Sequence, residues 1–341
     1  MDRIENVAHL EDLLSEPTEQ VVETLARVDG DLIVLGVAGK MGPTLARMAR
    51  IASDRAGVRR RVLGVARFSD AAQEAKLRAW GVETIRCDLL DTAQLARLPD
   101  APNVVFMTGM KFGATGQEAR TWAMNCWLPG MVCQRYPTSR IVAFSTGNVY
   151  GLTPVALGGS VESDPLAPVG EYAQSCLGRE RIFEHFSRTS DLPMSLLRLN
   201  YATEMRYGVL VDLAQRVREG GPVNLTMGHL NAIWQGDANA MALASFAQVS
   251  SPPCVLNLAG PEMLSVRRVA EEYGRLFGRS VTFQGVESAD ALLSNGQLVH
   301  RLFGYPRVSA GQMMQWIVDW VDRGGETLDK PTHFEVRDGR Y

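Results

Sequence analysis

The sequence predicts an α/β protein whose main domain is a doubly wound parallel sheet, followed by a smaller C-terminal α/β lobe. Two observations carry this prediction. Short apolar segments alternate with amphipathic helical segments over roughly the first two hundred residues, an order typical of a parallel sheet covered by helices on both faces. After that point, helices are joined by loops that contain Gly and Pro, which indicates a second, smaller unit.

The spacing of apolar residues predicts each element in turn. Short apolar runs predict strands at Leu32–Leu35, Arg61–Ala66, Thr84–Cys87, Asn103–Thr108, Arg140–Ser145, Met194–Leu199 and Cys254–Leu258. Helical spacing in the first domain predicts helices over residues 43–53, 71–80, 92–97, 115–134 and 172–187. In the second lobe we expect helices over residues 209–219, 237–249, 265–277 and 310–323.

Three glycines follow the first expected strand. Gly36, Gly39 and Gly42 recur at intervals of three, between a buried strand and the start of a helix. A dinucleotide pyrophosphate requires this order: the first glycine permits a tight turn, the second lets the backbone approach phosphate, and the third lets the helix pack close to the strand. The helix N-terminus then offers free N–H groups to the anion. The segment predicts a Rossmann-type dinucleotide-binding site, to which we also assign Lys40 and Met41 of the turn.

The end of the second expected strand indicates which dinucleotide is bound. NAD-binding sheets carry an acidic residue here that holds the ribose 2′-hydroxyl, whereas an arginine suits the 2′-phosphate of NADP. This sequence has Ala66 at the acidic position and Arg67 directly after it, and Lys40 offers a second cation. We therefore expect NADP, with NAD as the alternative. The competing interpretation is that Arg67 and Lys40 are solvated loop charges.

Residues at two further strand ends are assigned to the cofactor. These are Asp88 and Leu89 after the third expected strand, and Thr108 at the end of the fourth. A carboxylate at Asp88 can accept a hydrogen bond from the adenine amino group. Asp91 equally suits the cap of the next helix.

The chain divides into four segments. Residues 1–30 form an N-terminal helical extension that is broken near Pro17, and residues 31–200 form the dinucleotide-binding domain. Residues 201–330 form a substrate lobe that mixes with the first domain, and residues 331–341 form a polar C-terminal tail. For the tail, an ordered segment and a frayed terminus are both open interpretations.

Composition and charge argue against several classes of protein. The formal net charge of −3 gives no reason to expect nucleic acid or an anionic membrane as a partner. The five cysteines contain no Cys-x-x-Cys pair and the five histidines are scattered, which indicates reduced thiols and no metal site. No run approaches the ~18 apolar residues of a membrane span, and the N-terminus does not read as a signal peptide. We expect a cytoplasmic protein.

Two segments beyond the glycine turn resemble a known family. Phe144–Gly151 (FSTGNVYG) follows the fifth expected strand, and Tyr172–Glu180 (YAQSCLGRE) lies in the following helix. Together with the glycine triplet, these segments resemble the extended short-chain dehydrogenase/reductases, also called the NAD-dependent epimerase/dehydratase family. The likeness covers about residues 30–325 and implies the same two-part architecture.

The resemblance also implies a site. It makes Tyr172 both a residue of the cofactor site and the acid/base that exchanges a proton with a sugar or alcohol oxygen. It makes Thr146 the hydroxyl that orients this oxygen, while hydride passes to or from the nicotinamide. Asn148, Arg198 and Asn200 are assigned to the substrate, with turn or structural roles as open alternatives. The implied substrate is a small, carbohydrate-like molecule.

One position departs from the family pattern. The helix lysine four residues after the tyrosine is replaced by Cys176, which we keep in the cofactor site. In the family this lysine lowers the tyrosine pKa and holds the nicotinamide ribose, and a neutral thiol does neither. Four interpretations stay open: a rewired enzyme assisted by Arg179 or by cofactor charge, a Tyr172 that mainly donates protons, a silent cofactor-binding protein, and, least favoured, a nucleophilic cysteine.

The sequence therefore predicts an NAD(P)-dependent oxidoreductase or epimerase/dehydratase-type enzyme, which acts by hydride transfer on a sugar or a sugar-derived hydroxyl or keto compound. The alternative is a catalytically silent NAD(P)-binding regulatory or scaffold protein. The resemblance also implies a homodimer, with Trp122, Trp127 and Phe183 on helices 115–134 and 172–187 as candidate contacts. Core packing is the competing role for each of these side chains.

Overall fold

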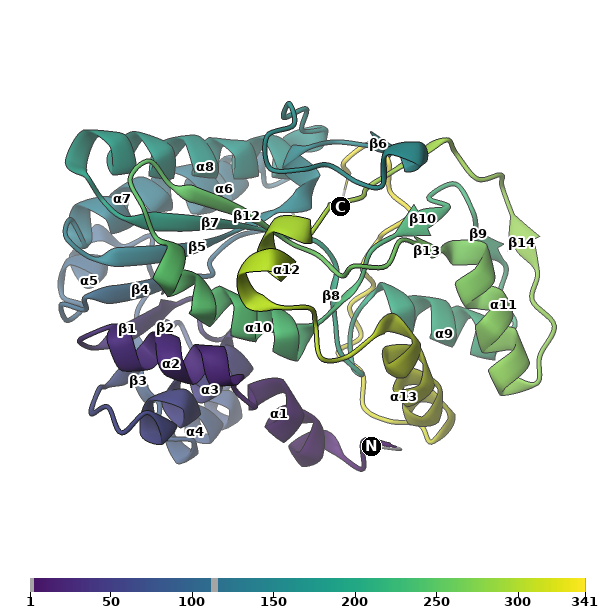
Figure 1. Cartoon of the computed structure of the whole chain (residues 1–341), viewed down its shortest axis with the longest axis horizontal. Coiled ribbons are helices and arrows are strands. Elements are labelled where there is room, and N and C mark those ends of the chain that lie inside the picture. The colour runs from purple at the N-terminus through teal and green to yellow at the C-terminus, as the bar shows by residue number, and fades with distance from the viewer. Residues whose placement is uncertain (1–2, 112–115, 341) are drawn as a thin grey trace.

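A parallel sheet forms the centre of the molecule, whose computed structural model describes residues 3–111 and 116–340. The strands of this sheet are β1 (Leu32–Leu35), β2 (Val62–Ala66), β3 (Glu83–Arg86), β4 (Asn103–Phe106), β5 (Arg140–Thr146), β7 (Met194–Leu199) and β12 (Cys254–Leu258). Over the described residues, these seven strands lie in the order β12-β7-β5-β4-β1-β2-β3 (Figure 1). The doubly wound sheet is confirmed, and its strand order reverses next to β1, where such sheets bind ligands.

Helices cover both faces of the sheet because its inner strands are apolar on both faces. In β1, Leu32 and Val34 belong to one apolar cluster, and Ile33 and Leu35 belong to another. The first cluster includes residues of α2 (Glu19–Arg27), α3 (Gly42–Arg55), α4 (Ala71–Ala79), α10 (Gln235–Ala244) and α12 (Gln297–Phe303). The second includes residues of α5 (Thr92–Ala96), α7 (Leu128–Arg135) and α8 (Gly170–Ser190).

The second lobe has its own core of helices and short two-stranded ribbons. Its helices are α9 (Val209–Glu219), α11 (Val266–Phe277) and α13 (Ala310–Asp322). The ribbons pair β6 (Thr153–Pro154) with β15 (Asp290–Ala291), β8 (Ala202–Thr203) with β11 (Ile233–Trp234), β9 (Val223–Asn224) with β14 (Phe283–Gln284), and β10 (His229–Leu230) with β13 (Leu264–Ser265). In the core between them, the rings of Trp234 and Trp316 meet edge to face with their centres 5.6 Å apart.

The N-terminal extension joins the two cores. Its first helix, α1 (Val7–Ser15), ends before Pro17, and α2 begins after it, as the expected break requires. Leu10 and Leu14 of α1 are fully buried in the core of the second lobe, whereas Leu25 of α2 is fully buried against the sheet. The extension therefore holds the two lobes in a fixed relation.

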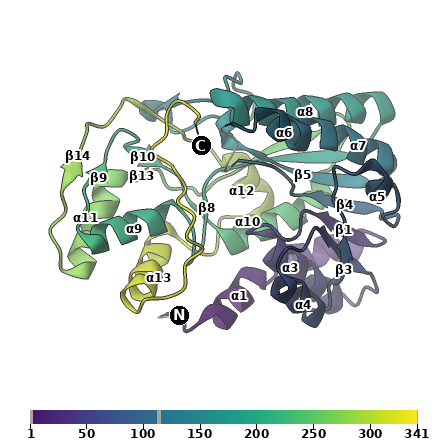
Figure 2. The ribbon, with the colours of Figure 1, turned by 180° about the vertical axis from the view of Figure 1, so that it is seen from behind.

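The described part of the C-terminal tail is ordered and runs across both lobes (Figure 2). The N–H and hydroxyl of Thr332 donate to the Asp212 carboxylate at 2.8 and 2.6 Å, and Phe334 is buried in the second-lobe core. Further along, Gly339 packs against Gly170, at the start of α8, so closely that a Cβ on Gly170 would lie 2.5 Å from the Gly339 carbonyl oxygen. The described residues of the tail thus pack against both lobes.

One expected helix is divided in the structure. The segment 115–134 contains α6 (Glu118–Trp122), a π-helical turn at Ala123–Trp127 and then α7, while residue 115 lies outside the described residues. The π turn carries Asn125, whose side chain is fully buried and hydrogen-bonded. Such turns concentrate at functional sites and leave the apolar spacing almost unchanged, so the sequence pattern did not reveal this one.

Other differences are smaller. Helix α10 starts two residues earlier than expected and continues into a 3-10 turn at Ser245–Gln248, and α12 and the ribbons were not expected. Of the two roles open for Phe183, the structure has core packing and not contact with a second copy, because its ring is fully buried and packs edge-on against Phe106, with centres 5.2 Å apart. Among the described residues, no helix is long and apolar enough to cross a membrane.

Candidate active site

The glycine turn lies between β1 and α3, at the carboxyl edge of the sheet. Gly36 has a φ of 88°, and a Cβ there would lie 2.7 Å from Cγ2 of Thr108. A Cβ on Gly42 would lie 2.3 Å from the carbonyl oxygen of Val37, so the helix approaches the turn more closely than a side chain allows. At Gly39 the nearest atom is 3.5 Å away, an ordinary contact. The turn is therefore tight at both ends and accessible in its middle.

A cavity of about 550 Å³ opens beside this turn. It is lined by six of the residues predicted to bind the cofactor: Gly36, Gly39, Arg67, Asp88, Leu89 and Thr108. The hydroxyl of Thr108 is buried and has no hydrogen-bond partner among the described residues, which suits a ligand in the cavity. Arg120 of α6 also lines it; the sequence analysis missed this residue, although a basic side chain early in the helix after β4 is a usable signal.

The two aspartates after β3 have separate roles. Asp91 caps α5 and accepts hydrogen bonds from the N–H groups of Ala93 at 2.9 Å and Gln94 at 3.1 Å. Asp88 accepts a hydrogen bond from the N–H of Leu90 at 3.1 Å and lines the 550 Å³ cavity. The capping role therefore belongs to Asp91, and Asp88 has a carboxylate at the cofactor cavity. These side chains, the glycine turn and Arg67 fit the adenosine half of a dinucleotide.

A second, smaller cavity of about 170 Å³ begins at Lys40 and Met41 of the same turn. It is lined by the predicted acid/base, its hydroxyl partner and two predicted substrate ligands: Tyr172, Thr146, Asn148 and Asn200. Lys111, from the loop after β4, and Tyr207, from the second lobe, also line this cavity. The fold thus brings residues from strand ends, from a helix and from the second lobe to one place.

The side chain of Lys40 contradicts one prediction. We expected it to be a second cation for a cofactor 2′-phosphate, but it lines the smaller cavity and not the one that contains Arg67. Its Nζ lies 3.0 Å from the ring centre of Tyr207, a cation–π contact with the second lobe. Burial, and then repulsion from Lys111 and Lys330, lowers the pKa of Lys40 to about 7. Lys40 therefore lines the cavity that contains Tyr172 and not the one that contains Arg67.

Tyr172 lies near the start of α8, and its hydroxyl is hydrogen-bonded to Thr146 and to the thiol of Cys176. Burial, and then the neighbouring Cys176, raises the pKa of Tyr172 well above its usual value, while Arg179 acts in the opposite direction. The phenol therefore keeps its proton at neutral pH. The Thr146 hydroxyl donates onward to Oδ1 of Asn148 at 2.9 Å, which extends the hydrogen-bonded chain.

Two cationic side chains lie near Tyr172 although position 176 carries none. Arg179 is buried and donates to the carbonyl oxygen of Phe144 at 2.8 Å. The Nζ of Lys111 lies 5.9 Å from the ring centre of Tyr172, and burial lowers the pKa of Lys111 to about 8. Arg179 was expected near the tyrosine and Lys111 was not; its place in the loop that follows the fourth expected strand is the signal that could have identified it.

Asn125 ties the loop after β4 to α8. Its Oδ1 accepts from the N–H of Met110 at 3.1 Å, and its Nδ2 donates to the carbonyl oxygen of Met110 at 3.2 Å and to the hydroxyl of Ser175 at 2.8 Å. Nη2 of Arg179 donates to the same Oδ1 at 2.6 Å. The loop that carries Lys111 is therefore fixed relative to the helix that carries Tyr172.

Arg198 has a structural role in this geometry. Its guanidinium forms a bidentate ion pair with Glu180, with a shortest distance of 2.7 Å, and donates to the Tyr150 hydroxyl at 2.7 Å. The side chains of Arg198 and Glu180 are 5% and 4% exposed, and Ser145 donates to Glu180 at 2.5 Å. Arg198 is not among the described residues that line the three cavities. The geometry does not support the predicted substrate contact, because core groups occupy the guanidinium donors.

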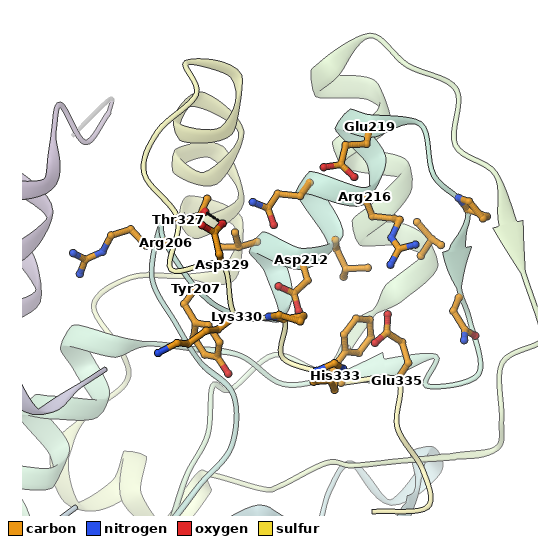
Figure 3. A pocket seen from close by; sticks show the side chains of 18 of the residues that line it. Arg206, Tyr207, Asp212, Arg216, Glu219, Thr327, Asp329, Lys330, His333 and Glu335 are labelled. Carbon is orange, nitrogen blue, oxygen red and sulfur yellow. Dashed lines mark hydrogen bonds between the residues drawn. The ribbon is translucent and has the colours of Figure 1, made fainter. Parts of the chain in front are cut away.

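A third cavity, of about 660 Å³, lies between α9 and the C-terminal tail (Figure 3). Charged side chains of both signs line it: Arg206, Asp212, Arg216, Glu219, Asp329, Lys330 and Glu335. Tyr207 lines both this cavity and the smaller one. The tail runs between these two cavities, since Thr332 lines the 170 Å³ cavity and its neighbours Pro331 and His333 line the 660 Å³ cavity.

The fold and the site define a Rossmann-type α/β protein with a tyrosine-containing cavity next to its glycine turn. Residues 32–203 match the model of the NAD dependent epimerase/dehydratase family, and this match spans the turn, Thr146 and Tyr172. The chain belongs to the NAD-dependent epimerase/dehydratase family. No curated protein sequence matches the chain.

Solved structures with the same fold cover 86% of this chain. A UDP-glucuronic acid 4-epimerase from Bacillus cereus, in complex with UDP-glucuronic acid and NAD, has 18% identity, a TM-score of 0.70 and 99% of its own chain covered. A dTDP-glucose 4,6-dehydratase from Streptomyces venezuelae, DesIV, as a double mutant with NAD bound, has 20% identity, a TM-score of 0.72 and 98% covered. A dTDP-glucose 4,6-dehydratase from Bacillus anthracis in complex with NAD has 16% identity, a TM-score of 0.72 and 97% covered. At these identities the likeness establishes the fold alone.

The assignment of Arg198 predicts a large effect on stability. We expect Arg198→Met to lower the free energy of unfolding by about 3–5 kcal/mol, because Glu180 is then left charged and unpaired in the core. The matched control is Arg188→Met, which removes an exposed partner of Glu184 and is expected to change stability by less than about 1 kcal/mol. Chemical denaturation followed by circular dichroism measures both. Equal stability of the two variants contradicts the structural role of Arg198.

Proposed function

We propose that the chain is an NADP(H)-dependent oxidoreductase or epimerase/dehydratase-type enzyme that acts by hydride transfer on a sugar or a sugar-derived hydroxyl or keto compound. One observation carries the proposal: Tyr172 and Thr146 share a small cavity that begins at the glycine turn. Membership of the family supports the dinucleotide. The complex of the B. cereus epimerase with UDP-glucuronic acid and NAD supports a sugar-derived substrate.

The strand ends around the 550 Å³ cavity hold the dinucleotide in this proposal. The accessible backbone at Gly39 and the N-terminus of α3 offer N–H groups to the pyrophosphate. Asp88, Leu89 and Thr108 line the adenosine side, and the exposed guanidinium of Arg67 suits a 2′-phosphate. When bound, the dinucleotide supplies the hydride donor or acceptor at C4 of its nicotinamide.

Tyr172 acts mainly as a proton donor in this proposal. Because its pKa is raised, the phenol is protonated at neutral pH and can give its proton to a carbonyl oxygen as the carbon gains hydride. Oxidation of an alcohol needs the phenolate as a base, and this form is reached only far above neutral pH. Cys176 is fully buried with its own thiol pKa raised, so it supplies no charge that would favour the phenolate. The geometry therefore favours carbonyl reduction.

Thr146 and the two asparagines orient the substrate. Thr146 is hydrogen-bonded to Tyr172 and lines the same cavity, so both hydroxyls can reach one substrate oxygen. Nδ2 of Asn200 is buried at this cavity and has no hydrogen-bond partner among the described residues, which suits a hydroxyl of a polyol. Asn148 holds Thr146 through its Oδ1.

The cofactor assignment is tested through Arg67. We expect Arg67→Ala to weaken NADPH binding by about 10- to 100-fold and to leave NADH binding unchanged, because only NADPH carries the 2′-phosphate. Calorimetric titration of the purified protein measures both affinities. Arg59→Ala removes an exposed arginine outside the lining of the cofactor cavity and serves as the control. A wild type that prefers NADH shows that Arg67 is a solvated charge.

The catalytic assignment is tested through Tyr172. We expect Tyr172→Phe to reduce NADPH-dependent reduction of keto sugars by about 10²- to 10⁴-fold, with NADPH affinity unchanged, because only the proton donor is lost. NADPH absorbance follows turnover across a panel of keto sugars. Tyr305→Phe, at a tyrosine that is 71% exposed, is the control. A Tyr172→Phe variant with full activity refutes the role of Tyr172.

The second candidate function is a catalytically silent NADP(H)-binding regulator or scaffold. Cys176 in place of the helix lysine favours it, because nothing at that position lowers the pKa of Tyr172. The hydrogen-bonded alignment of Tyr172 with Thr146 favours the enzyme. Wild-type protein that binds NADPH and turns over none of the panel identifies the silent alternative.

For the assembly, we infer a homodimer through α6 and α8. Trp122 and Trp127 are 38% and 52% exposed and, with Ile182 of α8, line an apolar hollow on the surface. We expect Trp127→Glu to convert a dimer into a monomer in sedimentation velocity, because a carboxylate is poorly tolerated in an apolar interface. Leu157→Glu, at an apolar residue 70% exposed elsewhere, is expected to leave the dimer intact. A monomeric wild type disproves the dimer.

A further inference from the structure

One wall of the cavity at Tyr172 comes from the C-terminal tail. The described tail residues, 331–340, form no helix or strand, and they run from the second lobe to the start of α8 (Figure 2). Thr332 lines the 170 Å³ cavity, and its neighbours Pro331 and His333 line the 660 Å³ cavity. Thr332 therefore stands between the two spaces.

The position of Thr332 is set by a single carboxylate. Its N–H and its hydroxyl donate to the same oxygen of Asp212 on α9, at 2.8 and 2.6 Å, and the residue is only 2% exposed. Four residues earlier, the N–H of Leu328 donates to the carbonyl oxygen of Arg206 at 3.0 Å. This stretch of chain is thus held against α9 and the segment that precedes it.

The tail is also attached after Thr332. Phe334 is buried in the second-lobe core. The guanidinium of Arg337 donates to the carbonyl oxygen of Asp290 at 3.1 Å and forms an ion pair with the carboxylate of the same residue. At the end of the described chain, Gly339 packs against Gly170. A segment without helix or strand keeps one position when side chains and backbone anchor it at several points, as they do here.

The contribution of Thr332 to the cavity is steric. A threonine has two hydrogen-bond donors, its N–H and its hydroxyl, and Asp212 accepts both of them. Thr332 therefore has no donor left for a ligand at Tyr172, and what it presents to the cavity is the volume of its side chain.

The space that remains at Tyr172 is small. Sites for drug-sized ligands have volumes of about 300–1,000 Å³. The cavity at Tyr172 lies below this range at 170 Å³, whereas the cavity on the other side of the tail lies within it at 660 Å³. Tyr207 lines both cavities, so they are neighbours. The tail thus determines whether a molecule held at Tyr172 can extend toward α9.

We propose that the tail is a fixed wall of the tyrosine cavity and that Thr332 is a specificity-determining residue. The wall accepts a sugar derivative of single-ring size at Tyr172 and excludes one that carries a bulky group on the side of α9. Such selection works by a built-in clash and not by an added attraction. The inference rests on the proposed function, since it takes Tyr172 as the place of reaction and narrows the class of substrate.

The experiment measures which molecules reach the cavity. Asn200→Cys places a reporter thiol at the cavity, at a residue whose Nδ2 has no hydrogen-bond partner among the described residues. The native cysteines are not among the described lining residues, and peptide mass spectrometry separates their labelling from that of the reporter. Two thiol reagents are compared, the small methyl methanethiosulfonate and the bulky fluorescein-5-maleimide.

The reporter is then combined with a change in the wall. Thr332→Gly removes the side chain that separates the two cavities. Thr327→Gly is the matched control, because Thr327 lies five residues earlier in the same chain segment and lines the 660 Å³ cavity but not the 170 Å³ one. Far-UV circular dichroism verifies that all variants are folded.

With the wall intact, we expect the small reagent to label the reporter and the bulky one to react with it slowly. We expect Thr332→Gly to raise the rate of the bulky reagent at least about tenfold and to change the rate of the small reagent much less. Thr327→Gly is expected to leave both rates unchanged. A loss of structure alone would raise both rates together, so the ratio of the two rates reports the wall.

Three results overturn the proposal. The first is a reporter that both reagents label equally well with the wall intact. The second is a ratio of rates that Thr332→Gly leaves unchanged or that Thr327→Gly alters to the same extent. The third is a reporter that neither reagent reaches, because a substrate could not enter that cavity either. Failure of the proposed function is a separate result, since the labelling uses neither dinucleotide nor sugar.

Discussion

The geometry of the site depends on the side chain of Asn125. Its amide oxygen accepts from the N–H of Met110, and its amide nitrogen donates to the carbonyl oxygen of Met110 and to the hydroxyl of Ser175 on α8. The amide oxygen also accepts from Arg179, which donates in turn to the carbonyl oxygen of Phe144 in β5. One buried amide thus fixes the loop after β4, the helix of Tyr172 and the strand before Thr146. Because a buried amide must satisfy its donors and its acceptor, the elements that satisfy them have little freedom to move apart. The π turn in which Asn125 lies gives it this position.

The charges around Tyr172 are arranged differently from the pattern the family resemblance implies. A helix lysine at position 176 would have placed one cation directly beneath the phenol. Here Cys176 fills this space, while positive charge comes from Arg179 in the core and from Lys40 and Lys111 at the cavity wall. Charge at the wall acts on whatever enters the cavity more than on the buried hydroxyl.

The sequence predicted the sheet because a strand buried on both faces is a continuous apolar run, and it predicted the glycine turn because Gly36 and Gly42 meet contacts that exclude a Cβ. Such features are local. The sequence did not predict which cavity the Lys40 side chain enters, because Tyr207, whose ring it contacts, comes from the other lobe. Arg198 was assigned to substrate because its partner Glu180 becomes a neighbour only through the packing of α8 on the sheet. The linear pattern does not show which side chains from different helices and strands become partners.

The tail gives the site its outer boundary. Thr332 is bound to Asp212 on α9, and at the far end Gly339 packs against Gly170, two residues before Tyr172. A single stretch of chain therefore links the second lobe to the helix of the proposed proton donor and separates the 170 Å³ cavity from the 660 Å³ one. Residues 330–334 thus form the wall between the two cavities.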